Sequence, residues 1–385
     1  MASRMPIARA FLAVARARAV LSVAAALLLA GSAGAGTLQV PSAGFPTIQS
    51  AINAAVPGDT VVVSKGTYLE SLDIKEKSGI VLRAAGKVVI PASDFNTGIT
   101  IALSTDIEVR GFTIEDAREH SIVVACNSNV LVTKCRILGG DGDGIRVFSG
   151  SGVRLEHNFI QGVALTGIRL LEIQPDEPGG QACGIPGDVL LLKNRVQQVG
   201  GDGISITGTD IVAEKNRVVD VGGDGVLALP AGPGAVFRKN RIVGAGGRGV
   251  VVQATGITLD HNRIQKSASS GVVLEPGAAG ATLLGNRVVK AGTNGLVLDA
   301  PDGLCTGARA IKCGTSAFMV GGNGNVLELC RASHPWFHGF NVYCSSSTFV
   351  HCRATTSGYL DLVDSAAGDS TNSYVGCTFK TTNMP

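Results

Sequence analysis

The sequence predicts an all-β chain that folds as a single-domain parallel β-helix, and three observations carry the prediction. A phrase centred on Asn, such as Lys193-Asn194-Arg195, returns in steps of 22, 24, 22 and 24 residues. A Gly followed by aliphatic residues, such as Gly203-Ile204, begins nine residues after each Asn. Short apolar runs alternate with Gly, Asp and Asn, without a helical period. Repeats of this length are typical of solenoids, and the alternation favours strands.

Residues 1–35 have the composition of a secretory signal peptide. Four Arg residues precede the apolar run 19–30, and Ala33-Gly34-Ala35 offers a cleavage site near Ala35. The run is shorter than the ~20 residues that a bilayer span needs, so a membrane anchor fits less well. We therefore expect a secreted or periplasmic protein without a membrane span, whose mature part is residues 36–385.

The net charge argues against a nucleic-acid partner. The whole chain carries a formal charge of +3, and residues 1–35 hold four Arg and no acid, which leaves about −1 on the mature part. Bulk positive charge is the footprint of nucleic-acid binding, and the mature part does not have it.

Residues 36–58 are predicted to cap the N-terminal end. Within 47–55, Ile48, Ala51, Ile52 and Ala55 follow the spacing of a short amphipathic helix. Such a helix would cover the unpaired edge of the first turn. Weak strands at 60–64, 80–83, 99–102 and 107–110 lead into the clear repeats. We expect about thirteen turns of three short strands, or ~60 Å at one strand spacing per turn.

The opening of the mature chain resembles a known superfamily. The segments PTIQSAINAA (46–55), PGDTVVV (57–63) and GTY (66–68), with the later Asn-Arg-Val phrases, resemble right-handed parallel β-helix proteins of the pectin-lyase-like superfamily. The resemblance implies the right-handed fold over nearly the whole mature chain. It does not specify an activity, because such proteins include lyases, hydrolases, epimerases and proteins without known chemistry.

Two segments depart from the regular repeat. The period from Asn158 to Asn194 is 36 residues long, and its surplus lies in 172–187, which we predict to be a long loop. Long loops on rigid scaffolds often carry functional sites. Residues 331–385 are predicted to form the C-terminal turns and cap. Trp336, the only Trp, lies there; it either seals the end of the solenoid, which we favour, or stacks on a sugar ring.

Nine Cys in an exported protein allow disulfides, and the odd number leaves one unpaired within a monomer. Four occupy the Asn position of their repeats: Cys135, Cys330, Cys352 and Cys377. We expect these to stack inside as small apolar groups, although a ~4.8 Å step between turns also lies within disulfide reach. The pairing of the other five cannot be read from their spacing.

The repeated phrase predicts two columns of side chains. The Asn residues should point inward, where stacked amides satisfy one another and the turn backbone. The following residue should point outward and form a basic stripe of Arg195, Arg217, Arg241, Arg263 and Arg287. The stripe is either a solvated surface or a track that binds an anionic polysaccharide; stacking costs only ~1 kcal/mol per pair in water.

A third set of residues contains the ingredients of catalysis. Asp143, Asp202 and Asp224 each precede the Gly of the second phrase, Asp141 lies nearby, and His120 lies one turn earlier. Arg146 and Arg169 should point outward beside them. In lyases of the superfamily that the chain resembles, carboxylates hold Ca²⁺ against a uronate while an Arg or Lys removes the α proton. The same acids also fit plain turns, in which Asp bonds its own backbone.

The sequence therefore predicts a secreted, monomeric β-helix protein that binds an acidic polysaccharide. On the resemblance, His120, Arg146 and Arg169 are the candidate catalytic residues of a Ca²⁺-dependent lyase; Asp141, Asp143, Asp202 and Asp224 are the candidate metal ligands. The five Arg of the stripe and Trp336 are the candidate polysaccharide-binding residues. Binding itself requires no cofactor. The alternative is a surface or envelope scaffold without enzymatic activity.

Overall fold

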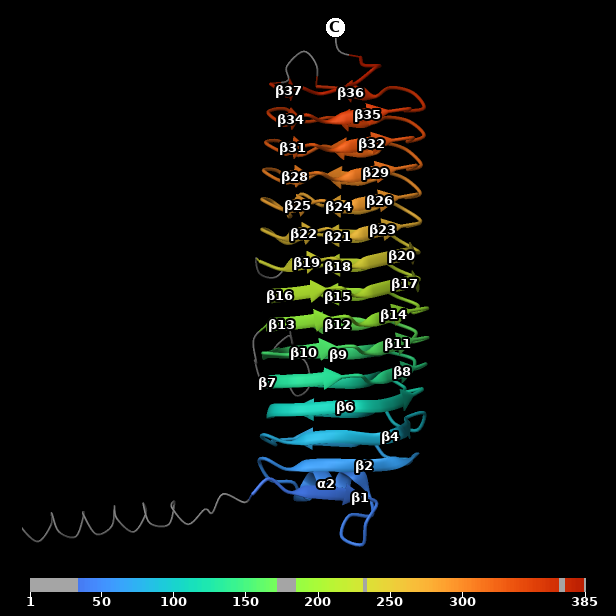
Figure 1. Ribbon diagram of the computed structural model, residues 1–385, viewed down its shortest axis with the longest axis vertical. Coiled ribbons are helices and arrows are strands. Elements are labelled where there is room, and N and C mark those ends of the chain that lie inside the picture. The colour runs from blue at the N-terminus through green and yellow to red at the C-terminus, as the bar shows by residue number, and fades with distance from the viewer. Residues whose placement is uncertain (1–33, 172–184, 231–233, 367–370, 384–385) are drawn as a thin grey trace, which may run out of the picture.

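The computed structural model describes residues 34–171, 185–230, 234–366 and 371–383. The chain winds into one straight stack of about 14 turns, with the N-terminal turns at one end and the C-terminal turns at the other (Figure 1). The predicted parallel β-helix is confirmed. Most of the predicted signal peptide (1–35), most of the predicted loop (172–187) and Cys183 lie outside the described residues.

The N-terminal turns contain the longest strands and the one helix of the described chain. Their elements are β1 (Thr37–Val40), α2 (Ile48–Ala54), β2 (Thr60–Thr67), β3 (Leu72–Lys75), β4 (Val81–Pro91), β5 (Thr97–Ala102), β6 (Thr105–Glu115) and β7 (His120–Thr133). Three short strands per turn is therefore wrong here, because β7 continues around a corner in which Cys126 and Asn129 have φ of 56° and 53°.

Each later turn contributes one strand to each of three faces. The first face contains β9 (Asp143–Ser151), β12 (Ile168–Leu171), β15 (Ile204–Ile206), β18 (Val226–Ala228), β21 (Val250–Val252), β24 (Val272–Leu274), β27 (Leu296–Leu298), β30 (Phe318–Val320), β33 (Phe340–Val342) and β36 (Leu362–Asp364). The second face contains β10 (Arg154–Glu156), β13 (Gly187–Leu192), β16 (Thr209–Glu214), β19 (Val236–Arg238), β22 (Thr258–Asp260), β25 (Thr282–Leu284), β28 (Leu304–Thr306), β31 (Val326–Glu328), β34 (Thr348–Val350) and β37 (Ser373–Val375).

The third face contains β8 (Arg136–Leu138), β11 (Phe159–Gln161), β14 (Arg195–Gln197), β17 (Arg217–Val221), β20 (Arg241–Ala245), β23 (Arg263–Gln265), β26 (Arg287–Val289), β29 (Arg309–Ile311), β32 (Arg331–Ser333) and β35 (Arg353–Thr355). Every strand pairs in parallel with the strand one turn away, and equivalent residues of successive repeats lie opposite each other. The repeat in the sequence is thus a translation along the axis of the stack.

Buried amides run through the interior at the corner before the third face. The Nδ2 of Asn194 donates to the Oδ1 of Asn216, and the Nδ2 of Asn216 donates to the Oδ1 of Asn240, each at 3.1 Å. The same bond links Asn158 to Asn194, Asn240 to Asn262 and Asn262 to Asn286. Each amide also bonds the backbone of a neighbouring turn. These bonds satisfy polar atoms that the stack removes from water.

The cysteines of this column are free thiols. Cys135, Cys330 and Cys352 are fully buried, and none of them forms a disulfide. The Sγ of Cys330 lies 3.6 Å from the Sγ of Cys305, which belongs to the neighbouring turn. Burial raises the pKa of Cys135 to about 11. Stacked apolar thiols are thus confirmed for these three cysteines, whereas Cys377, the fourth predicted member, is free but only half-buried. Cys126 is disulfide-bonded.

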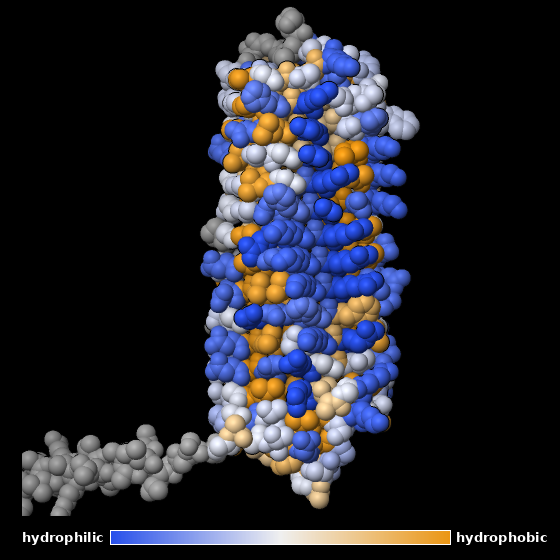
Figure 2. All heavy atoms as spheres, in the orientation of Figure 1, coloured by the Kyte–Doolittle hydropathy of each residue, from blue (hydrophilic) through white to orange (hydrophobic). Residues whose placement is uncertain are grey.

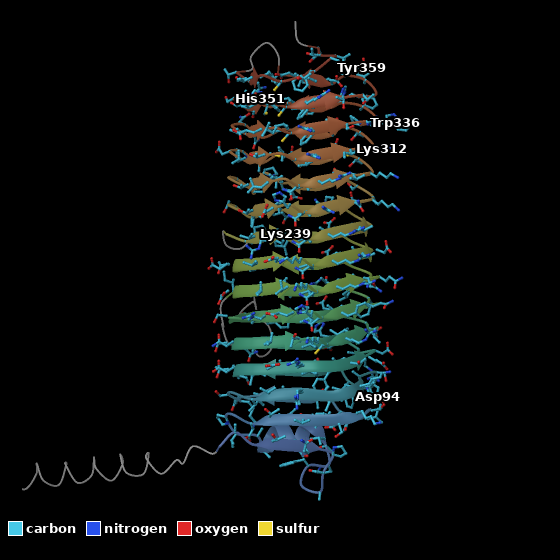
Figure 3. The ribbon with its side chains drawn as sticks, in the orientation of Figure 1. Asp94, Lys239, Lys312, Trp336, His351 and Tyr359 are labelled. Atoms are coloured by element: carbon cyan, nitrogen blue, oxygen red, sulfur yellow. The ribbon has the colours of Figure 1, made fainter. Side chains whose placement is uncertain are left out.

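Both ends of the stack are covered, but not as expected at the C-terminus. At the N-terminus α2 buries Ile48, Ala51 and Ile52, as predicted. Trp336 does not seal the other end: it is 75% exposed, and β36 and β37 lie beyond it. It projects from the flank of the stack (Figure 3). The last turns are closed instead by a cluster of aromatic rings, Phe340, Phe349, Tyr374 and Phe379.

Candidate functional site

The third face presents an uninterrupted line of eight arginines, which we call the arginine column. Strand pairing places each of them opposite the next: Arg195, Arg217, Arg241, Arg263, Arg287, Arg309, Arg331 and Arg353. All eight are exposed. Seven strand spacings separate the first from the last, so the column is ~34 Å long. The predicted outward orientation of the stripe is confirmed.

Three members of the column were missed by sequence reasoning. Arg309, Arg331 and Arg353 follow Ala308, Cys330 and Cys352, where the repeat has lost its Asn. The Asn phrase therefore does not mark these turns. The 22-residue step from Arg287 to Arg309, and from there to Arg331 and Arg353, is the signal that does. At the N-terminal end Phe159 interrupts the line, with the guanidinium groups of Arg136 and Arg195 at 4.7 and 5.6 Å from its ring centre.

The arginine column is not neutralised by acids. Among the described residues, the ion pairs involve other cations, such as Arg238 and Lys215 with Glu214, and none includes a member of the column. Hydrophilic residues form continuous bands along this side of the stack (Figure 2). Exposed like charges in a row create a positive potential, which attracts anionic ligands.

A groove of about 1030 Å³ lies along the middle of the arginine column. Arg241, Arg263, Arg287 and Arg309 line it. The residue before the Asn position is Lys in earlier turns, including Lys239 at the edge of the groove (Figure 3). In the groove this position is His261, then Gly285 and Gly307, and the two glycines add no side chain to the floor. These positions have left-handed backbone, with φ of 57° at Gly285 and 56° at Lys239.

A second cluster of charged side chains lies on the first face, where β7, β9 and β12 are neighbours. The carboxylate of Asp143 is fully buried. Its Oδ2 lies 3.6 Å from Arg146 Nε and 3.9 Å from His120 Nδ1, and its Oδ1 lies 3.6 Å from Arg169 Nε. The predicted catalytic residues His120, Arg146 and Arg169 therefore do come together. Two guanidinium groups share this carboxylate, and the acids Glu119 and Asp202 are also close enough to interact with His120 and Arg169 respectively.

His120 is held in its neutral form. The backbone N–H of Asp143 lies 3.2 Å from Nδ1, and a guanidinium nitrogen of Arg146 lies 2.5 Å from Nε2. An imidazolium offers donors only, so donors on both sides disfavour protonation. Burial, followed by the charge of Arg146, lowers the pKa of His120. The imidazole could accept a proton from a substrate only if one of these donors, such as the Arg146 side chain at Nε2, moved away.

The predicted metal ligands do not form a cluster. In the part of the chain that the structure describes, no group of three or more His, Cys, Asp or Glu could hold a metal. Asp143 Oδ1 accepts from the backbone N–H of Thr166, Asp202 from that of Asp224, and Asp224 from that of Arg248. These acids therefore cap the turn above them. Asp141 is exposed in the same turn as Asp143. Ca²⁺ binding stays a prediction.

In the middle of the first face, around Val251, the outward residues are covered. Arg248 bonds Asp224 at 2.9 Å and Glu275 at 2.7 Å, and Gln253 also donates to Glu275. Val251, which lies between Arg248 and Gln253 in the chain, is fully buried. The open part of the first face near Asp143 is thus limited to the turns of His120, Arg146 and Arg169.

Trp336, the last predicted binding residue, does not belong to either cluster. It precedes β33, and its backbone N–H donates to the carbonyl of Cys313. Its ring is exposed on the flank and stacks on no other aromatic ring among the described residues. No described helix is long and apolar enough to cross a membrane.

Comparison with known proteins supports the architecture. Residues 61–172 and 183–304 match the family model described as right handed beta helix region. No curated protein sequence matches. The chain is similar to the catalytic unit of an α-1,3-glucanase from Streptomyces thermodiastaticus, with 17% identity, a TM-score of 0.60 and coverage of 91% of this chain and 71% of that one.

Two epimerases have similar structures. A periplasmic alginate epimerase shares 12% identity with a TM-score of 0.54, over 91% of this chain and 84% of that chain. The A-module of a mannuronan C-5 epimerase from Azotobacter vinelandii shares 14% identity with a TM-score of 0.53, over 88% and 94% of the two chains. At these identities the likeness is one of fold.

Proposed function

We propose that this chain, which belongs to the right-handed β-helix family, binds an acidic polysaccharide along the arginine column. One observation carries the proposal: eight exposed arginines stand one strand spacing apart, and none of them forms an ion pair with an acid in the part of the chain that the structure describes. A polyuronate carries a carboxylate on every sugar, so several charges meet several arginines at once. The guanidinium fork suits carboxylates because it can donate two parallel hydrogen bonds.

The shape of the surface and the comparisons support the same ligand. The groove over Gly285 and Gly307 gives a chain of sugar rings room to lie against Arg263 and Arg287. Three proteins of similar fold are named as an α-1,3-glucanase, an alginate epimerase and a mannuronan epimerase, so polysaccharides suit this architecture. Mannuronan is itself a polyuronate.

The experiment reverses two charges at the centre of the groove. The double variant Arg263→Glu, Arg287→Glu should bind alginate about tenfold more weakly or worse, since ~1.4 kcal/mol of lost attraction is tenfold in Kd. Affinity electrophoresis in alginate and in neutral dextran measures it. Lys65→Glu, Lys87→Glu is the matched control, because both Lys are exposed near the N-terminal end. The proposal is contradicted if alginate retards the wild type and both variants equally. It is also contradicted if neutral dextran retards the wild type as strongly as alginate does.

A second candidate function rests on the cluster around Asp143. Arg146 and Arg169 would hold the carboxylate of a uronate, which would draw Arg146 away from His120 Nε2. That freed nitrogen would then accept the proton from the carbon next to the carboxylate. Loss of that proton is the shared first step of cleavage by elimination and of inversion at the same carbon. The step relies on this chain's own residues, and bound Ca²⁺ would only add positive charge next to the carboxylate.

Solvent deuterium tests the second candidate directly. Alginate or polygalacturonate is incubated with the protein in D₂O and examined by NMR. Inversion should place deuterium on the carbon next to the carboxylate, and elimination should produce an unsaturated sugar at a new chain end. Arg169→Ala should abolish both signals, whereas Arg154→Ala, an exposed arginine on β10, should keep them. If the wild-type protein yields neither signal, the cluster is not catalytic, and the binding proposal stands on its own test.

A further inference from the structure

A separate pocket opens on the first face near the C-terminal end of the stack. Its volume is about 370 Å³. Met319 of β30 and Asn341 of β33 line it, with Asn294 and His338 from the adjoining turns and Phe337 and Tyr343. Strand pairing places Asn341 opposite Met319, in the line of outward residues that begins with Arg146 and Arg169. The pocket therefore lies on the same face as the Asp143 cluster, several turns away.

The pocket contains polar atoms that the protein leaves unsatisfied. Asn341 is 9% exposed, and its Nδ2 donates to the hydroxyl of Tyr343 at 2.7 Å. Its Oδ1 is buried and has no hydrogen-bond partner within the described residues, and neither has Nδ1 of His338. Exchanging O and N of the amide does not help, because Tyr343 satisfies only one end. Buried polar atoms without partners are uncommon and indicate a missing ligand or water.

Further polar and aromatic groups surround these two atoms. The Nδ2 of Asn294 contacts only the Sδ of Met319, a weak acceptor, at 3.7 Å, while its Oδ1 accepts from Thr315 and Ser316. The ring of Phe337 packs beside those of His338 and Tyr359, with centres 5.3 and 6.0 Å apart. The pocket thus offers acceptors, a donor and the faces or edges of aromatic rings.

The pocket also differs from the arginine column in charge. None of its lining residues is Lys, Arg, Asp or Glu. Its only titratable groups are His338 and Tyr343; burial lowers the pKa of His338, which favours the neutral ring. An anionic ligand would be desolvated here without a counter-charge, which is costly. An uncharged polyol needs no counter-charge.

We propose that this pocket binds an uncharged sugar residue. Its hydroxyl groups donate to Asn341 Oδ1 and His338 Nδ1, one ring oxygen or hydroxyl accepts from Asn294, and its C–H face rests against the aromatic side chains. A few convergent polar groups beside apolar and aromatic side chains are the usual composition of a small-ligand site. The site goes beyond acidic-polymer binding, because it selects a neutral ring at a different face of the stack.

Met319 provides a local reporter for the test. The chain has four Met, and the other three are Met1, Met5 and Met384 near the termini. In full-length protein labelled at the methionine methyl groups, maltose, cellobiose or nigerose should shift the Met319 resonance saturably, while sodium glucuronate should not. Asn341→Leu, which keeps the side chain's size, should weaken binding about tenfold or more, the loss expected for one buried hydrogen bond.

Controls separate binding from folding. Asn341→Leu removes an unsatisfied polar atom and should melt no lower than the wild type; His338→Phe serves as a second variant with the same expected loss of binding. Arg263→Glu, Arg287→Glu should bind the neutral sugars normally, so failure of one proposal leaves the other untouched. The pocket proposal is overturned if no neutral disaccharide shifts Met319, if glucuronate binds as well, or if both folded pocket variants bind like the wild type.

Discussion

The position of a residue within the repeat decides whether its side chain is buried in the stack or exposed on its surface. Asn216 points inward, where it accepts from the backbone N–H and the Nδ2 of Asn194 and donates to the carbonyl of Leu191 and to Asn240. Its neighbour Arg217 points outward and is exposed. Adjacent residues therefore have opposite roles, one in stability and one in binding, and substitutions can separate them.

Asn216→Ala should destabilise the protein by on the order of 3 kcal/mol, because it leaves the N–H of Asn194 buried without its partner and removes the amide's bonds to Leu191 and Asn240. Urea denaturation followed by circular dichroism measures the change. Arg217→Ala is the matched control and should stay within about 0.5 kcal/mol of the wild type. Equal midpoints for Asn216→Ala and Arg217→Ala would show that the buried amides contribute nothing.

Protonation of His120 should weaken the fold at acidic pH. Its pKa in the folded protein is lowered, chiefly by burial and then by Arg146, so the unfolded chain takes up the proton first. Stability should therefore fall as the pH drops below the unfolded value of ~6.5, and His120→Gln should flatten this part of the profile. Urea midpoints between pH 5 and pH 8 test it; parallel profiles for the two proteins contradict the assignment.

At the scale of elements, the first turn depends on how α2 is held. Glu70 accepts from the backbone N–H groups of Ile48 and Gln49 at 3.0 and 2.9 Å. Thr47 and Ser50 form a reciprocal capping box at the same end. A carboxylate at a helix N-terminus compensates both the free N–H groups and the helix dipole. The helix in turn covers the unpaired edge of the first turn.

Glu70→Ala should therefore loosen the N-terminal cap by about 1–2 kcal/mol, the usual value of a lost helix cap. Hydrogen exchange of α2, β1 and β2 should accelerate, while exchange in β20 and later strands should not, since a solenoid transmits changes mainly to neighbouring turns. Lys75→Ala, an exposed change on β3, serves as control. Uniform acceleration along the stack would mean that the cap and the repeats unfold as one unit.

At the scale of the whole molecule, the arginine column places like charges in line for eight successive turns. Neighbouring pairs repel by ~1 kcal/mol each in water before salt screening. Nothing in the fold requires this, because the Asn and aliphatic columns supply the packing. A surface that costs stability and lacks acidic partners is consistent with selection for binding, and the relation between stability and binding can be measured.

Arg263→Glu should raise the melting temperature in ~10 mM salt, where screening is weak, because an acid between Arg241 and Arg287 turns two repulsions into attractions. The same variant should bind alginate more weakly. Differential scanning calorimetry at low and high salt measures the first effect, and the gain should shrink as salt is added. A variant that melts lower at low salt would show that Arg263 stabilises the fold, and the column would then lose its functional interpretation.

Residue patterns alone predict the stack, the inward Asn and outward Arg positions, and the capping helix. These follow from the repeat because each turn is the previous one moved by one strand spacing, so equal positions in the repeat become columns. The repeat also predicts that His120 aligns with Asp143 and Arg146 with Arg169, as strand pairing shows. Arg309, Arg331 and Arg353 follow Ala308, Cys330 and Cys352, so the Asn phrase does not mark them.

The contacts between side chains of different columns could not be predicted from the repeat and are seen only in the folded chain. Asp143 lies buried between two arginines, and Asp143, Asp202 and Asp224 each accept a hydrogen bond from the backbone of the turn above. Val251 is covered, whereas Asn341 faces a pocket with an unsatisfied oxygen. The repeat fixes positions along the axis, but contacts across it depend on the length of each turn and the rotamers of long side chains, which periodicity does not encode.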